Sequence, residues 1–173
     1  GVVPEEDARE IRARAAFDLE RVDEVERVTR HDVAAFVQVV GDSVGAAGRW
    51  VHFGLTSSDV LDTGLALQLR DAAGLLLDAL EGLLDVAKRT ALAHRDTVMA
   101  GRTHGVVAEP TSFGHKVALW VFELDRDRER LRRAREAVSV GAISGAVGTY
   151  AQVDPRVEEQ VCAELGLRAA EAS

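Results

Sequence analysis

Apolar residues along this chain recur at three- and four-residue steps, and no long stretch shows the two-residue alternation of a half-buried strand. Proline stands only at positions 4, 110 and 155, so long stretches contain no residue that would break a helix. The pattern therefore predicts an all-α fold, an elongated bundle of long helices.

Five helical segments follow from this pattern. They are expected at residues 5–27, about 33–40, 59–94, 112–138 and 155–165. Acidic residues after Pro4 suit the first helix start, Thr111 or Ser112 suits the fourth as N-cap, and Asp154 and Gly166 suit the two ends of the last. The stretches RWVHFGLTSSDV and AGRTHGVVAEP, which flank the longest helix, are interpreted as loops.

The longest helix, about 35 residues or about 50 Å, carries leucines around much of its circumference. One short chain cannot bury so wide an apolar surface, so other subunits are expected to cover it. We expect residues 1–56 to end one helical domain and residues 57–173 to begin a central long-helix bundle.

Composition narrows the class of protein. Hydrophobic residues make up 47% and charged residues 29%, as in a soluble globular protein. The formal charge of −8 does not favour nucleic acid, and no apolar run approaches a membrane span. Cys162 stands alone, which excludes an intrachain disulfide and fits a reducing compartment.

Among the five histidines, His104 has the most suggestive neighbours. It lies in RTHGVVAEP, between Thr103 and Gly105. An imidazole can exchange a proton near neutral pH, and the adjacent glycine lets a ligand approach the backbone closely. A structural role for His104 is equally compatible with the sequence alone.

The stretch LTSSDV opens the longest helix. Thr56 and Ser57 lie where unpaired N–H groups and the helix dipole favour a bound carboxylate or phosphate, and His52 is four residues upstream. Ser and Thr are also the commonest N-caps, but one cap needs only one hydroxyl.

A third cluster is RHDV, in which Asp32 could orient the imidazole of His31 beside Arg30, although the stretch also reads as an ordinary charged helix junction. No spacing of His, Cys or carboxylates indicates a metal site, and no glycine-rich phosphate fingerprint occurs. The glycines of GAISGAVGTY are interpreted as a tightly packed turn.

Taken in order, RHDVAAF, WVHFGLTSSDVLDT, GRTHGVVAEPTSFGHKVALW and ISGAVGTYAQVDPRVEEQVC resemble the adenylosuccinate lyases of the fumarase/aspartase superfamily. The likeness covers almost the whole chain. The resemblance implies a helical homotetramer in the cytoplasm that acts on purine nucleotides. Its reaction is the β-elimination of fumarate from adenylosuccinate, giving AMP, and from SAICAR, giving AICAR, with no cofactor or metal.

By the same resemblance, His104 matches the general acid and His31 a further catalytic histidine. Thr103 would contact the substrate, and His52 would lie near the phosphate. The residues that match the remaining substrate contacts are Arg30, Asp32, Thr56 and Ser57.

Two features of the family pattern are missing from these 173 residues. Nothing resembles the loop signature SSxMPxKxNP, which carries the general base, and an Arg-Tyr nucleotide contact is absent. We therefore expect an internal piece of a longer enzyme that is inactive by itself. The alternatives are another fumarate-releasing lyase of the superfamily and a non-catalytic helical assembly module.

Overall fold

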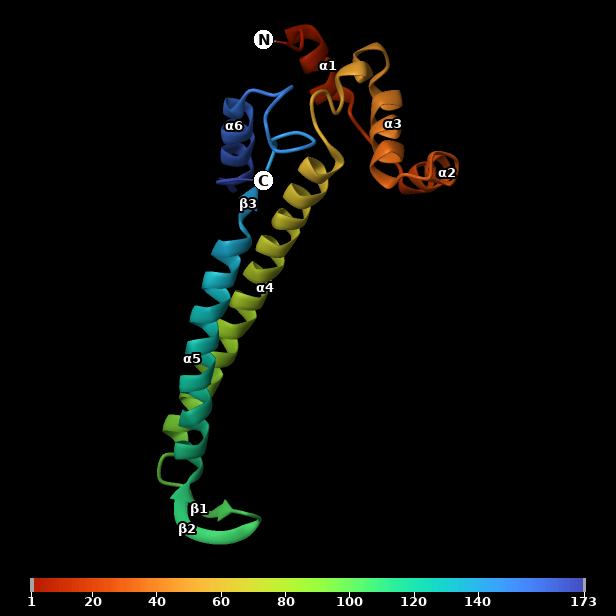
Figure 1. The fold of residues 1–173 in the computed structure, drawn as a ribbon. Coiled ribbons are helices and arrows are strands. Elements are labelled where there is room, and N and C mark those ends of the chain that lie inside the picture. The colour runs from red at the N-terminus through yellow and green to blue at the C-terminus, as the bar shows by residue number, and fades with distance from the viewer. Residues whose placement is uncertain (1, 173) are drawn as a thin grey trace. The chain divides into compact units, whose positions relative to one another are not determined.

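The computed structural model describes residues 2–172 and divides into two compact units (Figure 1). The first unit holds the residues up to Gly64 and those from Gly141 onward, and the second holds Leu65–Val140. The boundary expected after Thr56 between two domains of the parent stays a prediction.

Most described residues are helical, which confirms the mainly helical fold class. The helices are α1 (Glu5–Arg14), α2 (Leu19–Thr29), α3 (Asp32–Val44), the 3-10 helix η1 (Ala46–Trp50), α4 (Ser57–Ala93), α5 (Phe113–Val138) and α6 (Pro155–Leu165). The strands are β1 (Val98–Thr103), β2 (Val106–Ser112), β3 (Val140–Gly141) and β4 (Arg168–Ala169), paired as β1–β2 and β3–β4. None of the helices within residues 2–172 is long and apolar enough to cross a membrane.

The helix expected over residues 5–27 is in fact two helices, and that prediction was wrong. The chain leaves helical geometry at Ala15, and Asp18 then begins α2 by accepting the Arg21 N–H at 2.9 Å. An aspartate that caps a new helix satisfies one of its free N–H groups, which favours the break over continuation. Helix α2 then packs on α3 through Val25 and Val39.

The end of the first unit follows its local sequence signals closely. Asp154 caps α6 by accepting the Arg156 N–H, and Gly166 ends the helix with φ +67°, a conformation that favours glycine. The side chain of Arg156 also donates to Asp154, which lowers the pKa of that carboxyl to about 2. Both predicted bounds of this helix are confirmed.

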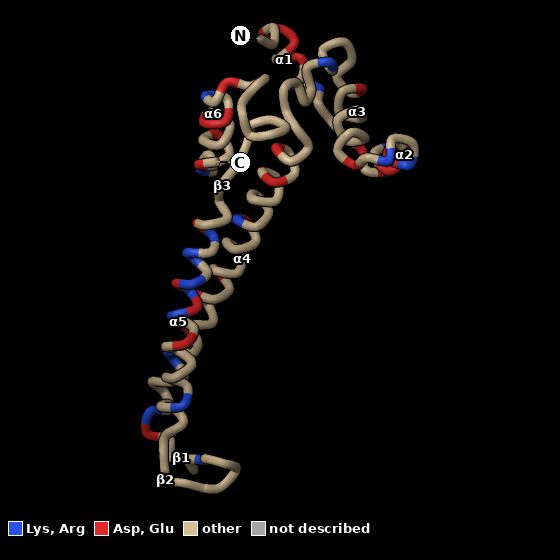
Figure 2. The backbone as a smooth tube through the Cα atoms, in the orientation of Figure 1, with Lys and Arg blue, Asp and Glu red and all other residues tan. Residues whose placement is uncertain are grey.

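The second unit is a hairpin of two long helices. Leu84 of α4 is fully buried, and Glu81 of the same helix accepts from Arg128 and Arg132 of α5 at 3.3 and 3.2 Å. Figure 2 shows acidic and basic residues alternating along α5, whereas most of the backbone of α4 carries neither charge. In these ion pairs α5 supplies the guanidinium groups and α4 supplies the carboxylate.

The stretch 100–110, interpreted from sequence as a loop, lies within the antiparallel β-hairpin of β1 and β2, so that interpretation was wrong. Thr103 pairs with Val106, which leaves His104 and Gly105 as a two-residue turn with φ of +51° and +75°. Positive φ at both central residues is the geometry of the tight hairpin turns whose twist matches the strands. The ladder is irregular between Ala100 and Arg102, and there the Gly101 backbone lies so close to the Glu109 carbonyl oxygen that any Cβ would overlap it.

Gly114, at the start of α5, allows the two long helices to meet. A Cβ at this position would overlap the Ala91 carbonyl oxygen and lie 2.5 Å from Arg95 Cα, and neither backbone can move freely. We expect Gly114→Ala to lower the free energy of unfolding of the chain by about 1–3 kcal/mol, as overpacking does. Thermal unfolding followed by circular dichroism measures the change.

Gly82 of α4 is the matched control, since a Cβ there meets nothing within 4 Å. Gly82→Ala should leave stability unchanged or raise it by up to about 1 kcal/mol through helix propensity. Equal melting temperatures for the two variants would contradict the close contact at Gly114.

Candidate functional site

Three residues singled out from the sequence meet at one pocket of the first unit. His31, His52 and Ser57 line a cavity of about 320 Å³ whose remaining walls are formed by residues of α3. They come from three separate segments: the turn before α3, the turn before α4, and the first residue of α4. The fold therefore brings together side chains that are up to 26 positions apart, between His31 and Ser57.

His31 is held by the helix that it begins. Its Nδ1 accepts the Ala34 N–H at 3.3 Å, so the imidazole is the N-cap of α3. The Nδ1 atom also lies 3.3 Å from Asp32 Oδ1, but a nitrogen that accepts the capping bond cannot donate to that carboxylate. In the capped form the proton of a neutral ring is on Nε2.

His52 has an unusual backbone and an unsatisfied ring atom. Its φ is +67°, an uncommon value for a residue other than glycine. Its Nε2 is buried and has no hydrogen-bond partner within residues 2–172. A strained backbone and a buried unpaired polar atom are both costly, and such features tend to be retained at functional sites.

Arg30 and Asp32 flank His31 but do not line its pocket. Arg30 ends α2 in the left-handed conformation, with φ +55°, and contributes to a separate cavity of about 380 Å³ beside Arg27. Asp32 Oδ1 accepts the Val33 N–H at 2.7 Å, so this carboxylate also serves the start of α3.

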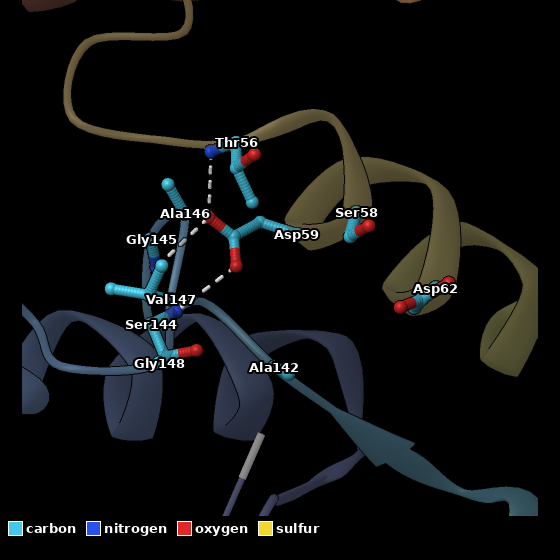
Figure 3. A pocket seen from close by; sticks show the side chains of 10 residues that line it. All are labelled: Thr56, Ser58, Asp59, Asp62, Ala142, Ser144, Gly145, Ala146, Val147 and Gly148. Carbon is cyan, nitrogen blue, oxygen red and sulfur yellow. Dashed lines mark hydrogen bonds between the residues drawn. The ribbon is translucent and has the colours of Figure 1, made fainter.

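Thr56 lies immediately before α4 and is tied to it by a reciprocal pair of bonds. Its N–H donates to Asp59 Oδ2 at 2.8 Å, and its carbonyl accepts the Asp59 N–H at 3.1 Å. Thr56 borders a second cavity of about 490 Å³, whose other wall is the loop Ser144–Gly148 (Figure 3). Thr56 and Ser57 thus line two different cavities at the start of one helix.

Two buried carboxylates hold the loop that forms this wall. Asp59 accepts the N–H groups of Ser144 and Gly145, at 3.0 and 3.2 Å (Figure 3). Glu158 of α6 accepts the Ile143 N–H at 2.6 Å and the Tyr150 hydroxyl at 2.8 Å. The bond to Glu158 raises the pKa of Tyr150, because it favours the protonated phenol.

Sequence reasoning did not assign a site role to Asp59 or Glu158. For Asp59 a signal existed, since Thr56-Ser57-Ser58-Asp59 has the Ser/Thr-x-x-acid spacing of a capping box. For Glu158 there was none, because its partners lie eight and fifteen residues away in an irregular loop.

His104 and Thr103 belong to the second unit. His104 is the first residue of the two-residue turn between β1 and β2, with an exposed side chain and φ +51°. Histidine is one of the few residues other than glycine that tolerates this region, and Gly105 completes the turn. Thr103, the last residue of β1, is also exposed. The hairpin therefore presents the imidazole at its end.

Nothing in the described residues groups three or more His, Cys, Asp or Glu side chains around a possible metal position. Burial raises the pKa of the Cys162 thiol, which disfavours the thiolate that a metal or a nucleophile requires.

Comparison with known proteins decides the family. The profile of the family described as "Lyase" matches residues 4–172, nearly the whole chain. The chain belongs to this lyase family. Solved structures agree: a fumarate lyase from Mesorhizobium sp. BNC1 superposes with a TM-score of 0.92 at 34% identity over 100% of this chain and 42% of that one. A 3-carboxy-cis,cis-muconate lactonizing enzyme from Pseudomonas putida gives 0.90 at 33% identity, over 99% of this chain and 41% of that one.

Curated relatives of the lyase are more similar in sequence. The adenylosuccinate lyase of Bacillus subtilis (strain 168) is 53% identical over 98% of this chain, and that of Synechocystis sp. (strain ATCC 27184 / PCC 6803 / Kazusa) is 53% identical over 96%. The chain spans 39% of the length of each. The resemblance to the fumarase/aspartase superfamily is therefore confirmed, as is the expectation that the match is to part of a longer enzyme.

Proposed function

We propose that the parent of this chain is an adenylosuccinate lyase, which releases fumarate from adenylosuccinate and from SAICAR by β-elimination. The observation that carries the proposal is its high identity to adenylosuccinate lyases across nearly all of its residues. In such a reaction a base removes a proton from the succinyl carbon, and an acid protonates the departing nitrogen.

In this proposal His104 is the acid, and its exposed position in a two-residue turn leaves the ring accessible to a substrate. Thr103 contacts the substrate from the same strand end. A general acid must reach within hydrogen-bond distance of the atom that it protonates, and a rigid hairpin positions such a group well.

The first unit would contribute substrate binding. Thr56 and Ser57 are the proposed carboxylate contacts at the start of α4, each from the cavity that it lines, and the helix dipole adds to their hydroxyl bonds. His31, His52 and Ser57 share one cavity, which fits the assignment of both histidines to the substrate. Arg30 and Asp32, on either side of His31, are the remaining proposed substrate contacts. The guanidinium of Arg30 is suited to bind the substrate phosphate.

The parent is further proposed to be a cytoplasmic homotetramer. Support comes from the second unit, where long helices leave large apolar side chains such as Leu75 (73% exposed) and Phe122 (63% exposed) uncovered. Exposed apolar surface of this extent usually marks an interface, and identical subunits are its commonest occupants.

The test is substrate choice by the full-length parent. Fumarate release is measured with adenylosuccinate, argininosuccinate and malate as separate substrates. We expect turnover of adenylosuccinate at a kcat/KM about 100-fold or more above the other two, because a site built to hydrogen-bond one substrate leaves its polar groups unpaired with the others. Preference for argininosuccinate or malate would reassign the parent within the superfamily, and release from none would favour a non-catalytic assembly module.

A further inference from the structure

Asp59 is a buried carboxylate, and every hydrogen bond that it accepts within residues 2–172 comes from a backbone N–H group. It is 5% exposed. Oδ2 accepts from Thr56 at 2.8 Å and from Gly145 at 3.2 Å, and Oδ1 accepts from Ser144 at 3.0 Å (Figure 3). No Lys, Arg or His within residues 2–172 forms an ion pair with it, so three amide dipoles and the start of α4 balance its charge.

These bonds join two segments that are more than 80 positions apart. Thr56 precedes α4, whereas Ser144 and Gly145 belong to the loop that forms the opposite wall of the same cavity. One carboxylate therefore fixes both Thr56, which lines the cavity, and the backbone of the loop that lines its other wall. Because a buried amide left unpaired is costly, each bond resists displacement of its segment.

We propose that Asp59 is a positioning residue for substrate binding, anchored on the loop 144–145 and holding Thr56 in the position from which it receives a substrate carboxylate. This proposal rests on the proposed function, in which Thr56 contacts that carboxylate. Both oxygens of Asp59 are already engaged by three N–H groups, so it acts through Thr56 and not by touching the substrate. Pre-organised binding groups of this kind depend on the side chains that support them.

Glu158 provides a matched comparison. It is also buried, at 3% exposed, and it holds the same loop through the Ile143 N–H and the Tyr150 hydroxyl. It makes no contact with Thr56. A variant at Glu158 therefore loosens the loop without releasing the residue proposed to bind the substrate.

The experiment uses the full-length parent and compares Asp59→Asn with Glu158→Gln. An asparagine offers only one acceptor atom, so at least one of the three N–H groups then faces an NH₂ group. We expect Asp59→Asn to raise KM about 10–100-fold, as loss of a supporting hydrogen-bond partner does, with kcat changed less than threefold. Glu158→Gln should lower the melting temperature while KM stays within threefold of wild type.

A double-mutant cycle with Thr56→Val separates positioning from stability. If Asp59 acts through the Thr56 hydroxyl, Asp59→Asn should raise KM less than threefold further once Thr56 is valine, because coupled residues are not additive. Asp59→Glu, which keeps the charge but displaces the oxygens by one methylene, should also raise KM and covers the case in which the asparagine variant does not fold.

Three results would overturn the proposal: an unchanged KM for the Asp59 variants, an equal KM increase for Glu158→Gln, or full additivity with Thr56→Val. Failure of the proposed function would give different results. If the wild-type parent prefers argininosuccinate or malate, the same KM comparisons are made with the preferred substrate, and the role of Asp59 is judged on them. A parent that releases fumarate from none of the three overturns both.

Discussion

Replacing His104 with glutamine in the full-length enzyme is expected to lower kcat by about 10²–10⁴-fold, the usual cost of losing a positioned general acid. A glutamine amide can form a hydrogen bond but cannot give a proton to the departing nitrogen. The side chain of His104 is exposed at the hairpin turn, so its loss should leave the packing of the unit intact. Fumarate release gives kcat, and thermal unfolding verifies the fold.

His104→Asn is the control for backbone strain. Position 104 has φ +51°, a conformation that asparagine adopts at lower cost than most residues. If the missing acid causes the loss, both variants should be slow to a similar extent. Recovery of activity in the asparagine variant would attribute the effect to the turn, and a near-normal kcat in both would remove His104 from the acid role.

The helices could be predicted wherever their signals are local. The last helix was predicted at both ends because a capping carboxylate, a proline at the first position and a terminal glycine all lie within the segment itself. The first helix was predicted too long because its apolar stripe continues across the break at Ala15–Asp18, and Asp18 reads equally well as a solvent-facing residue. Periodicity alone cannot reveal a new N-cap.

The β-hairpin of β1 and β2 was not predicted from the sequence, for two physical reasons. The irregularity at Gly101 interrupts the alternation of side chains, which hides the two-residue period. The turn also uses His104-Gly105 in place of the Asn-Gly or Asp-Gly pair that signals such hairpins most strongly. His104 therefore has two roles at this turn: it adopts the positive φ that the turn requires, and it is the proposed general acid.

The site was only partly accessible to sequence reasoning. His52 and Ser57 were selected together at the start of the longest helix and His31 from a separate cluster, and the structure places all three around one cavity. The carboxylates Asp59 and Glu158 were missed as site residues because each bonds to backbone N–H groups of an irregular loop that is distant in sequence. Backbone donors leave no residue-type pattern in a sequence, so contacts of this kind become visible only after folding.

The 173-residue chain by itself is expected to associate, because it leaves apolar surface uncovered. The second unit leaves several large side chains more than half exposed, among them Leu75, Leu76, Leu92 and Phe122. Copies of one chain usually cover such faces by symmetric association. Light scattering should therefore report a mass above that of the 18.6 kDa monomer, and a clean monomer would contradict the apolar-interface argument.

Association is not expected to restore catalysis. The chain carries the proposed acid, His104, and the proposed carboxylate contacts, Thr56 and Ser57, but no stretch that resembles the loop with the family's general base. Further copies of the same residues cannot supply that base, and losing one acid–base partner already costs about 10²–10⁴-fold. A fumarate assay on the associated sample should read background. Turnover near that of the full-length parent, in a sample shown by mass spectrometry to hold no longer chain, would place the base within these residues.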